Sequence, residues 1–187
     1  FEQAILDHQD KIPNFSYREL VYSWSEVFDP ATLEKAGKHL ADARKNVRGA
    51  DDIYRRRVEF IGIGYEYTRI MMELLTLYRR LGQAGVPLTA FSLAGDQAEA
   101  EKYKLPSLPS NVLELWKTRP EKPLQDTEKV VLLKRAVELG EARAKILQDN
   151  AENAALSLGM YQYTVDYNIR PWHRICVDEL AKLTSPR

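Results

Sequence analysis

Three glutamates recur at one spacing in the middle of the chain and are the first candidates for chemistry. Glu59, Glu66 and Glu73 stand seven residues apart, which places them along one flank of a helix. Acid–base catalysis there would need two carboxyl groups held at a defined separation beside a substrate. Arg55 precedes Glu59 by four residues, and Arg69 stands three after Glu66 and four before Glu73. This spacing favours a ladder of intrahelical ion pairs over a catalytic groove.

The other reactive residue types are few and scattered. His8, His39 and His173 form neither an HExxH nor a Glu-x-x-His motif, so the usual helical zinc and di-iron sites lack their ligands. Cys176 is the single cysteine and has no neighbouring signature of a nucleophile. Neither a G-x-S-x-G elbow nor a glycine-rich loop after a strand is present. We therefore expect no catalytic residue, no metal site and no cofactor.

A run of aromatic and polar residues between positions 160 and 173 is the best place for a ligand. Aromatic faces beside polar groups can stack on a sugar ring and bond its hydroxyls, but such residues also seal the end of a bundle or a joint between domains. We favour packing or domain contact and keep ligand binding as the alternative. The candidate ligand-binding residues are Tyr161, Tyr163, Asp166, Tyr167, Trp172, His173 and, from an earlier segment, Trp116.

Apolar residues at helical intervals indicate the elements that would position these side chains. Residues 51–81 carry two apolar series on opposite sides, which predicts a central helix covered on both, with Ile61 in a core. Other helices are expected over 127–158, over 17–27, from Asp29-Pro30 to about Gly49, and as a short closing helix around 177–183.

Residues 84–126 lack this periodicity and contain repeated prolines, which predicts a long irregular connection. No repeat of solenoid length is present. The sequence thus predicts an all-α, non-repetitive helical bundle with two long helices, a shorter N-terminal helix pair and a proline-punctuated connection. Small residues on the two long helices, Gly140 and Ala144 on one and Gly62 and Gly64 on the other, predict that these helices approach each other closely.

The composition limits the classes of partner. Lysine and arginine total 27 and aspartate and glutamate 27, so there is no global field to attract nucleic acid. No apolar run approaches the roughly 20 residues of a membrane-spanning helix. The length fits one helical domain, 1–187. Because the chain starts at Phe1 with neither an initiator methionine nor a signal peptide, we expect a fragment of a larger multidomain protein, whose other domains are its partners.

Three stretches carry a resemblance to a known family: residues 22–28, with the sequence YSWSEVF, the helix 33–44, and residues 57–68, which include RVEFI and GYEYT. Across Tyr17 to Leu77 the chain resembles the C-terminal helical region of large bacterial proteins of the uncharacterised DUF4838 family. Those proteins carry glycoside-hydrolase-like barrels related in outline to α-glucuronidases. The resemblance implies an extracytoplasmic bacterial protein that handles polysaccharide. It places any catalytic acid on the barrel, so no catalytic residue is carried over to this chain.

Three functions remain open at this level. The first is a non-catalytic helical accessory domain that packs against, and orients, a carbohydrate-active catalytic domain. The second is a carbohydrate-binding module that uses the aromatic C-terminal segment. The third is a helical enzyme of unknown reaction with a site under the irregular connection, where Trp116 and Arg119 are available.

Overall fold

The computed structural model describes residues 2–7, 27–88, 124–152 and 159–185, and it describes the backbone alone at positions 2, 4, 5 and 159–168. The expected helix over 17–27 lies almost entirely outside the described residues. The same is true of most of the connection 84–126, including Trp116 and Arg119.

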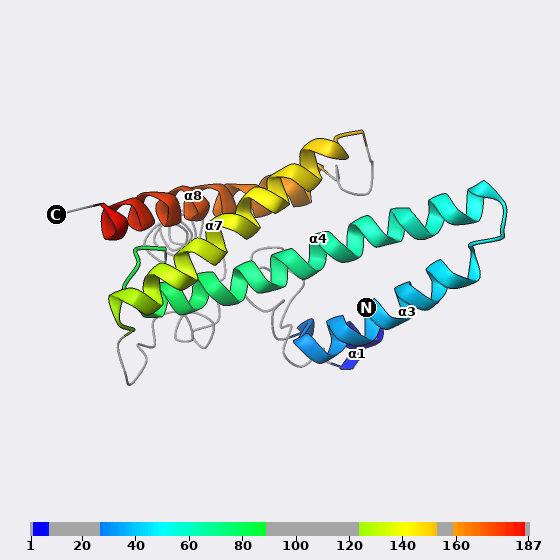
Figure 1. Ribbon diagram of the computed structural model, residues 1–187, viewed down its shortest axis with the longest axis horizontal. Coiled ribbons are helices and arrows are strands. Elements are labelled where there is room, and N and C mark those ends of the chain that lie inside the picture. Colours follow the sequence, from blue (N-terminus) through cyan, green and yellow to red (C-terminus); the bar gives the residue numbers. More distant parts are fainter. Residues whose placement is uncertain (1, 8–26, 89–123, 153–158, 186–187) are drawn as a thin grey trace, which may run out of the picture.

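Helices make up the fold in this part of the chain, and the predicted all-α bundle is confirmed. In chain order they are α1 (Glu2–Asp7), α3 (Pro30–Asn46), α4 (Asp52–Gln83), α7 (Asp126–Asp149) and α8 (Gly159–Thr184). Figure 1 shows α3 and α4 as an antiparallel pair, with α7 and α8 forming a second antiparallel pair along the C-terminal half of α4. The long helix α4 therefore packs against α3 and against the pair formed by α7 and α8.

Local capping chemistry defines the start of α3 and of α7. The backbone N–H of Thr32 donates to Asp29 Oδ1 at 2.7 Å, and Pro30 occupies the first turn, where its missing N–H costs nothing. These contacts confirm the predicted Asp29-Pro30 start. At α7 the backbone N–H of Gln125 donates to Glu128 Oε2 at 2.9 Å, the return bond of a capping box.

Helix α7 is shorter than its sequence pattern predicted, because it ends at Asp149 rather than near residue 158. Asn150 Nδ2 donates to the carbonyl oxygen of Ile146 at 2.9 Å and satisfies one of the carbonyls left open by the last turn. Residues 150–152 form a turn, and the remaining part of the predicted helix lies outside the described residues.

The C-terminal segment forms one helix of 26 residues, α8, instead of an aromatic tail followed by a short closing helix. Pro171 lies inside it and removes one helical hydrogen bond. Ile169, Trp172 and Cys176 share one face and are buried against α4 and α7, and this burial outweighs the local cost of the proline. The closing helix predicted around 177–183 is therefore the last part of a much longer helix.

Burial differs between the two halves of α4. From Tyr67 to Leu81 the apolar side chains lie in the core, together with residues of α7 and α8. The N-terminal half packs on α3 along one side, and its large apolar residues on the other side are exposed. The prediction that both sides of the whole helix are covered was therefore wrong for this half, and Ile61, expected in a core, is 60% exposed. The core consists of Val27, Phe28, Tyr67, Ile70, Met71, Met72, Leu74, Leu75, Leu77, Tyr78, Leu81, Val86, Leu88, Leu133, Ala136, Leu139, Ile169, Trp172 and Cys176.

Candidate functional site

The three regularly spaced glutamates are held in ion pairs. Glu66 accepts bonds of 2.9 and 2.6 Å from Nε and Nη2 of Arg69, whose guanidinium also lies 3.5 Å from Glu73. These pairs confirm the predicted ladder for Glu66 and Glu73. Glu59 instead accepts bonds of 3.1 and 2.9 Å from Arg44 of α3, so its predicted partner Arg55 was wrong.

Tertiary contacts add a further partner to Glu73. Arg135 of α7 donates to both of its carboxylate oxygens, at 2.7 and 3.1 Å. The hydrogen bonds from the Arg69 guanidinium lower the pKa of the Glu66 carboxyl group. A carboxylate held ionised by a paired arginine is a poor general acid, so Glu66 is unsuited to that role.

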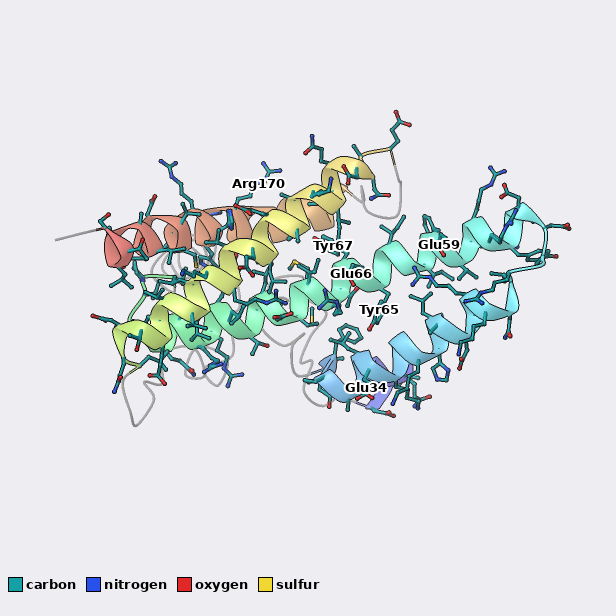
Figure 2. The ribbon with its side chains drawn as sticks, viewed as in Figure 1. Glu34, Glu59, Tyr65, Glu66, Tyr67 and Arg170 are labelled. Carbon is teal, nitrogen blue, oxygen red and sulfur yellow. The ribbon has the colours of Figure 1, made fainter. Side chains whose placement is uncertain are left out.

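Tyr65 and a glycine form the middle of the seam between α3 and α4. The Tyr65 hydroxyl donates to the carbonyl oxygen of Leu33 at 3.1 Å, and its ring lies where a side chain at Gly37 would stand. Figure 2 shows Tyr65 on the side of α4 that faces α3, whereas Tyr67 lies toward α7. Glycine at position 37 is therefore what allows the tyrosine to reach the backbone of α3.

The glycines of the two long helices face other helices than predicted. A β-carbon at Gly140 would meet the ring of His173 on α8, and one at Gly62 would meet the guanidinium of Arg44 on α3. Gly64 has open space around it, and Ala144 is exposed. The expected close approach of α4 and α7 through these residues was therefore wrong.

A buried polar cluster lies where α4, α7 and α8 meet. Arg143 is 4% exposed, donates from Nη2 to the Tyr67 hydroxyl at 3.3 Å, and has its guanidinium carbon 5.6 Å from the centre of the Tyr67 ring. The rings of Tyr78 and Trp172 meet edge to face with centroids 5.4 Å apart. Burial raises the pKa of Tyr78, so its hydroxyl stays protonated.

Cys176 belongs to the same buried region. Burial raises the pKa of its thiol to about 12, so the thiolate needed for nucleophilic attack does not form near neutral pH. In the part of the chain that the structure describes, no group of three or more His, Cys, Asp or Glu side chains could hold a metal ion. Nor is any helix there long and apolar enough to cross a membrane.

The structure separates the aromatic residues that were candidates for sugar binding. Trp172 is fully buried against Tyr78, so neither face of its indole is available for stacking on a sugar. His173 is half-buried beside Gly140. Trp116 lies outside the described residues. The structure describes only the backbone of the other four C-terminal candidates, which lie in the first turns of α8: Tyr161, Tyr163, Asp166 and Tyr167.

The N-terminal half of α4 exposes four large apolar side chains on one side. Ile53, Tyr54, Phe60 and Ile61 are 53%, 51%, 48% and 60% exposed, and we call them the distal apolar face. Tyr54, Phe60 and Ile61 belong to the two apolar series from which buried positions were predicted, whereas Ile53 lies outside both series. Only the position of the neighbouring helices distinguishes an exposed face from a buried one.

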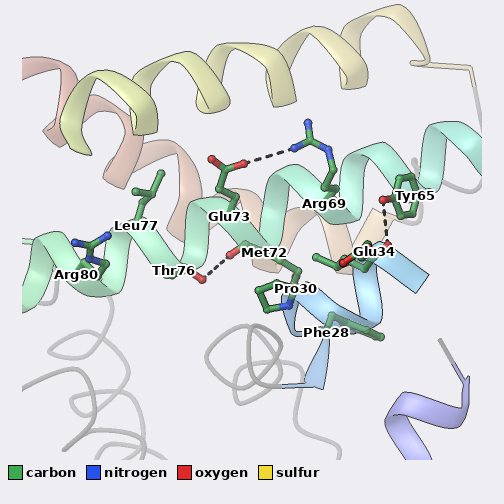
Figure 3. A pocket seen from close by; sticks show the side chains of 11 residues that line it. Phe28, Pro30, Glu34, Tyr65, Arg69, Met72, Glu73, Thr76, Leu77 and Arg80 are labelled. Atoms are coloured by element: carbon green, nitrogen blue, oxygen red, sulfur yellow. Dashed lines mark hydrogen bonds and ion pairs between the residues drawn. The ribbon is translucent and has the colours of Figure 1, made fainter. Parts of the chain in front are cut away.

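A groove with a volume of about 530 Å³ lies where the N-terminus of α3 meets the middle of α4 (Figure 3). Its walls combine apolar side chains with four charged ones, a feature that the sequence pattern did not predict because the two helices contribute residues far apart in the chain. The described residues that line it are Phe28, Pro30, Leu33, Glu34, Tyr65, Arg69, Met72, Glu73, Thr76, Leu77 and Arg80.

The fold of this chain is a helical bundle whose longest helix buries its large apolar side chains at one end and exposes them at the other. No family model, curated protein or solved structure matches this chain.

Proposed function

We propose that this chain is a non-catalytic helical accessory domain that docks on a neighbouring domain or protein through the distal apolar face of α4. The observation that carries the proposal is the contrast within one helix. The apolar side chains of its C-terminal half are buried in the core, whereas Ile53, Tyr54, Phe60 and Ile61 are about half exposed. Contiguous apolar surface rimmed by polar residues is typical of interaction sites.

The exposed face continues the stripe that α4 buries in the core. Phe60, Gly64, Thr68, Met71 and Leu75 follow one another at steps of three or four residues, so they share one side of the helix. Met71 and Leu75 are 1% and 2% exposed. A partner lying on the distal apolar face would therefore extend a packing surface that already exists.

The charge on this face favours an acidic partner. Arg57 lies four residues after Ile53 and three before Phe60, within the distal apolar face, and makes no ion pair with any described residue. A second copy docked through the same face would bring no carboxylate to match Arg57, because positions 53, 57, 60, 61, 64 and 68 contain none. The proposed partner surface is apolar and carries a carboxylate opposite Arg57, as charge complementarity requires.

The wider setting of the proposal comes from the resemblance of residues 17–77. In this setting the partner surface belongs to a glycoside-hydrolase-like barrel of a bacterial, extracytoplasmic protein that acts on polysaccharide. The ion-paired glutamates and the buried thiol of Cys176 support a non-catalytic role for the helical domain itself.

Hydroxyl-radical footprinting of this chain by itself and within the larger protein that the proposal implies tests the docking proposal. We expect Tyr54, Phe60 and Ile61 to be oxidised in the chain by itself and strongly protected in the longer protein. Val131, which is 64% exposed on α7, serves as the control and should be oxidised equally in both. Equal oxidation of the distal apolar face in both proteins would contradict docking. Protection that grows with the concentration of the chain by itself would show self-association instead.

Polysaccharide cleavage by the longer protein tests the accessory role. Replacing Phe60 and Ile61 by serine should lower the activity or stability of the catalytic domain while leaving the helical fold intact, because both residues are exposed. The matched control is Arg48→Gln, an exposed residue at the tip of the hairpin. Complete loss of turnover on replacing Glu66, with the fold intact, would contradict a non-catalytic role.

A further inference from the structure

The groove between α3 and α4 has the size and lining of a small-molecule site. Its volume of about 530 Å³ lies within the range of about 300 to 1,000 Å³ that drug-sized ligands occupy. Five apolar residues, one of them a proline, contribute to the lining: Phe28, Pro30, Leu33, Met72 and Leu77. Thr76 lies among them, and its hydroxyl donates to the carbonyl oxygen of Met72 at 2.9 Å (Figure 3). These apolar side chains give the apolar body of a ligand a surface to pack against.

Three of the four charged side chains in the lining are already neutralised by neighbours. Glu34 lies 2.6 Å from Lys38. Glu73 accepts bonds from Arg135, and Arg69 bonds to Glu66 and lies 3.5 Å from Glu73. These charges are bound within the protein and are less available to attract a ligand ion.

Arg80 is different. It lines the groove, its side chain is exposed, and it makes no ion pair or hydrogen bond with its guanidinium to any residue that the structure describes. A guanidinium presents several N–H donors in one plane, which matches the two oxygens of a carboxylate. The groove therefore combines an apolar wall with one available site for an anion.

We propose that this groove binds a small amphipathic carboxylate, with its apolar body against Phe28, Leu33 and Met72 and its carboxylate on Arg80. The proposal is independent of docking at the distal apolar face, which lies on the N-terminal half of α4. A cationic amphiphile lacks a partner here, because Glu34 and Glu73 are paired. An uncharged amphiphile cannot form the charge-assisted bond with Arg80.

Binding of dodecanoate to the chain tests the proposal, measured below its micelle concentration by displacement of a fluorescent apolar probe. We expect saturable binding of one dodecanoate. Dodecyltrimethylammonium, which has a chain of the same length and the opposite charge, should bind at least tenfold more weakly, because it cannot form the charge-assisted hydrogen bond with Arg80.

Two variants separate the contributions of charge and shape. Arg80→Gln should weaken dodecanoate binding by roughly tenfold or more, and Arg80→Lys should restore part of it. Thr76→Phe should block the groove without disturbing the fold, because Thr76 is exposed. The control, Arg48→Gln, removes an exposed arginine far from the groove and should leave binding unchanged.

Three outcomes would overturn the proposal. The first is equal binding of the anionic and cationic amphiphiles, which would indicate apolar adsorption without recognition of the charge. The second is an equal loss of binding in Arg80→Gln and Arg48→Gln, which would indicate a general effect of net charge. The third is undiminished binding in Thr76→Phe, which would place the ligand elsewhere.

Discussion

The imidazole of His173 on α8 lies directly against the α-carbon of Gly140 on α7. A β-carbon at position 140 would stand 2.7 Å from Cε1 and 3.0 Å from Cγ of His173, and closer still to Nδ1. Because Cγ is the root of the ring, the imidazole cannot avoid such a β-carbon by moving its far end alone. Glycine at this position therefore sets how closely α7 and α8 pack.

Gly140→Ala should destabilise the protein by about 1 to 2 kcal/mol. The gain in helix propensity is about 1 kcal/mol, and overpacking of a close contact costs more. Gly64→Ala on α4 is the matched control and should be stabilising by about 0.5 to 1 kcal/mol, because nothing lies within 4 Å of its β-carbon position. Urea unfolding of both variants measures the difference. Effects of the same sign at the two positions would contradict the close contact with His173.

His173 should make stability depend on pH. Burial lowers the pKa of its imidazole below the ordinary 6.5, with Glu141 opposing the shift and Arg143 adding to it. The unfolded chain therefore binds this proton more readily, so the contribution of neutral His173 is fully present above pH 6.5 and is lost as the pH falls toward its folded pKa. Nδ1 is buried and has no hydrogen-bond partner among the described residues, so a proton there would have no acceptor.

Urea midpoints between pH 8 and pH 5 measure this effect. The wild-type chain should lose more stability over this range than His173→Gln, which cannot titrate at that position. An identical loss in the two proteins would mean that His173 does not contribute.

Leu74 and Ile61 should respond very differently to truncation, although both belong to the apolar pattern of α4. Leu74 is fully buried, so Leu74→Ala should cost about 2 to 5 kcal/mol. Ile61 is 60% exposed, so Ile61→Ala should change the free energy of unfolding by no more than about 0.5 kcal/mol. Comparable costs in chemical denaturation would contradict the exposed assignment of the N-terminal half.

Trp172→Ala should destabilise the fold by about 3 to 5 kcal/mol, because a fully buried indole in contact with Tyr78 is removed. A loss of glycan binding in this variant would therefore report unfolding rather than a missing sugar contact. Single alanine variants of Tyr161, Tyr163 and Tyr167 are the better test of sugar binding. Glycan-array signal lost in these variants at unchanged melting temperature would support a carbohydrate-binding role for the start of α8.

Interactions between near neighbours in the chain could be predicted from the sequence. The Asp29-Pro30 start of α3, the length of α4 and the pairing of Arg69 with Glu66 and Glu73 all depend on residues within one turn or on a repeating pattern. The absence of strand patterns likewise predicted the all-α class. These features follow from backbone geometry and spacing, which are encoded locally.

Tertiary packing decided the features on which function depends. Glu59 and Glu73 found partners on α3 and α7, Gly140 met His173, and Trp172 became core. A periodic pattern marks which side of a helix is apolar, but it does not say where the neighbouring helices end. The other helices cover the C-terminal half of α4 more fully than its N-terminal half. The same spacing of apolar residues therefore produces a buried stripe at the C-terminal end and the distal apolar face at the N-terminal end.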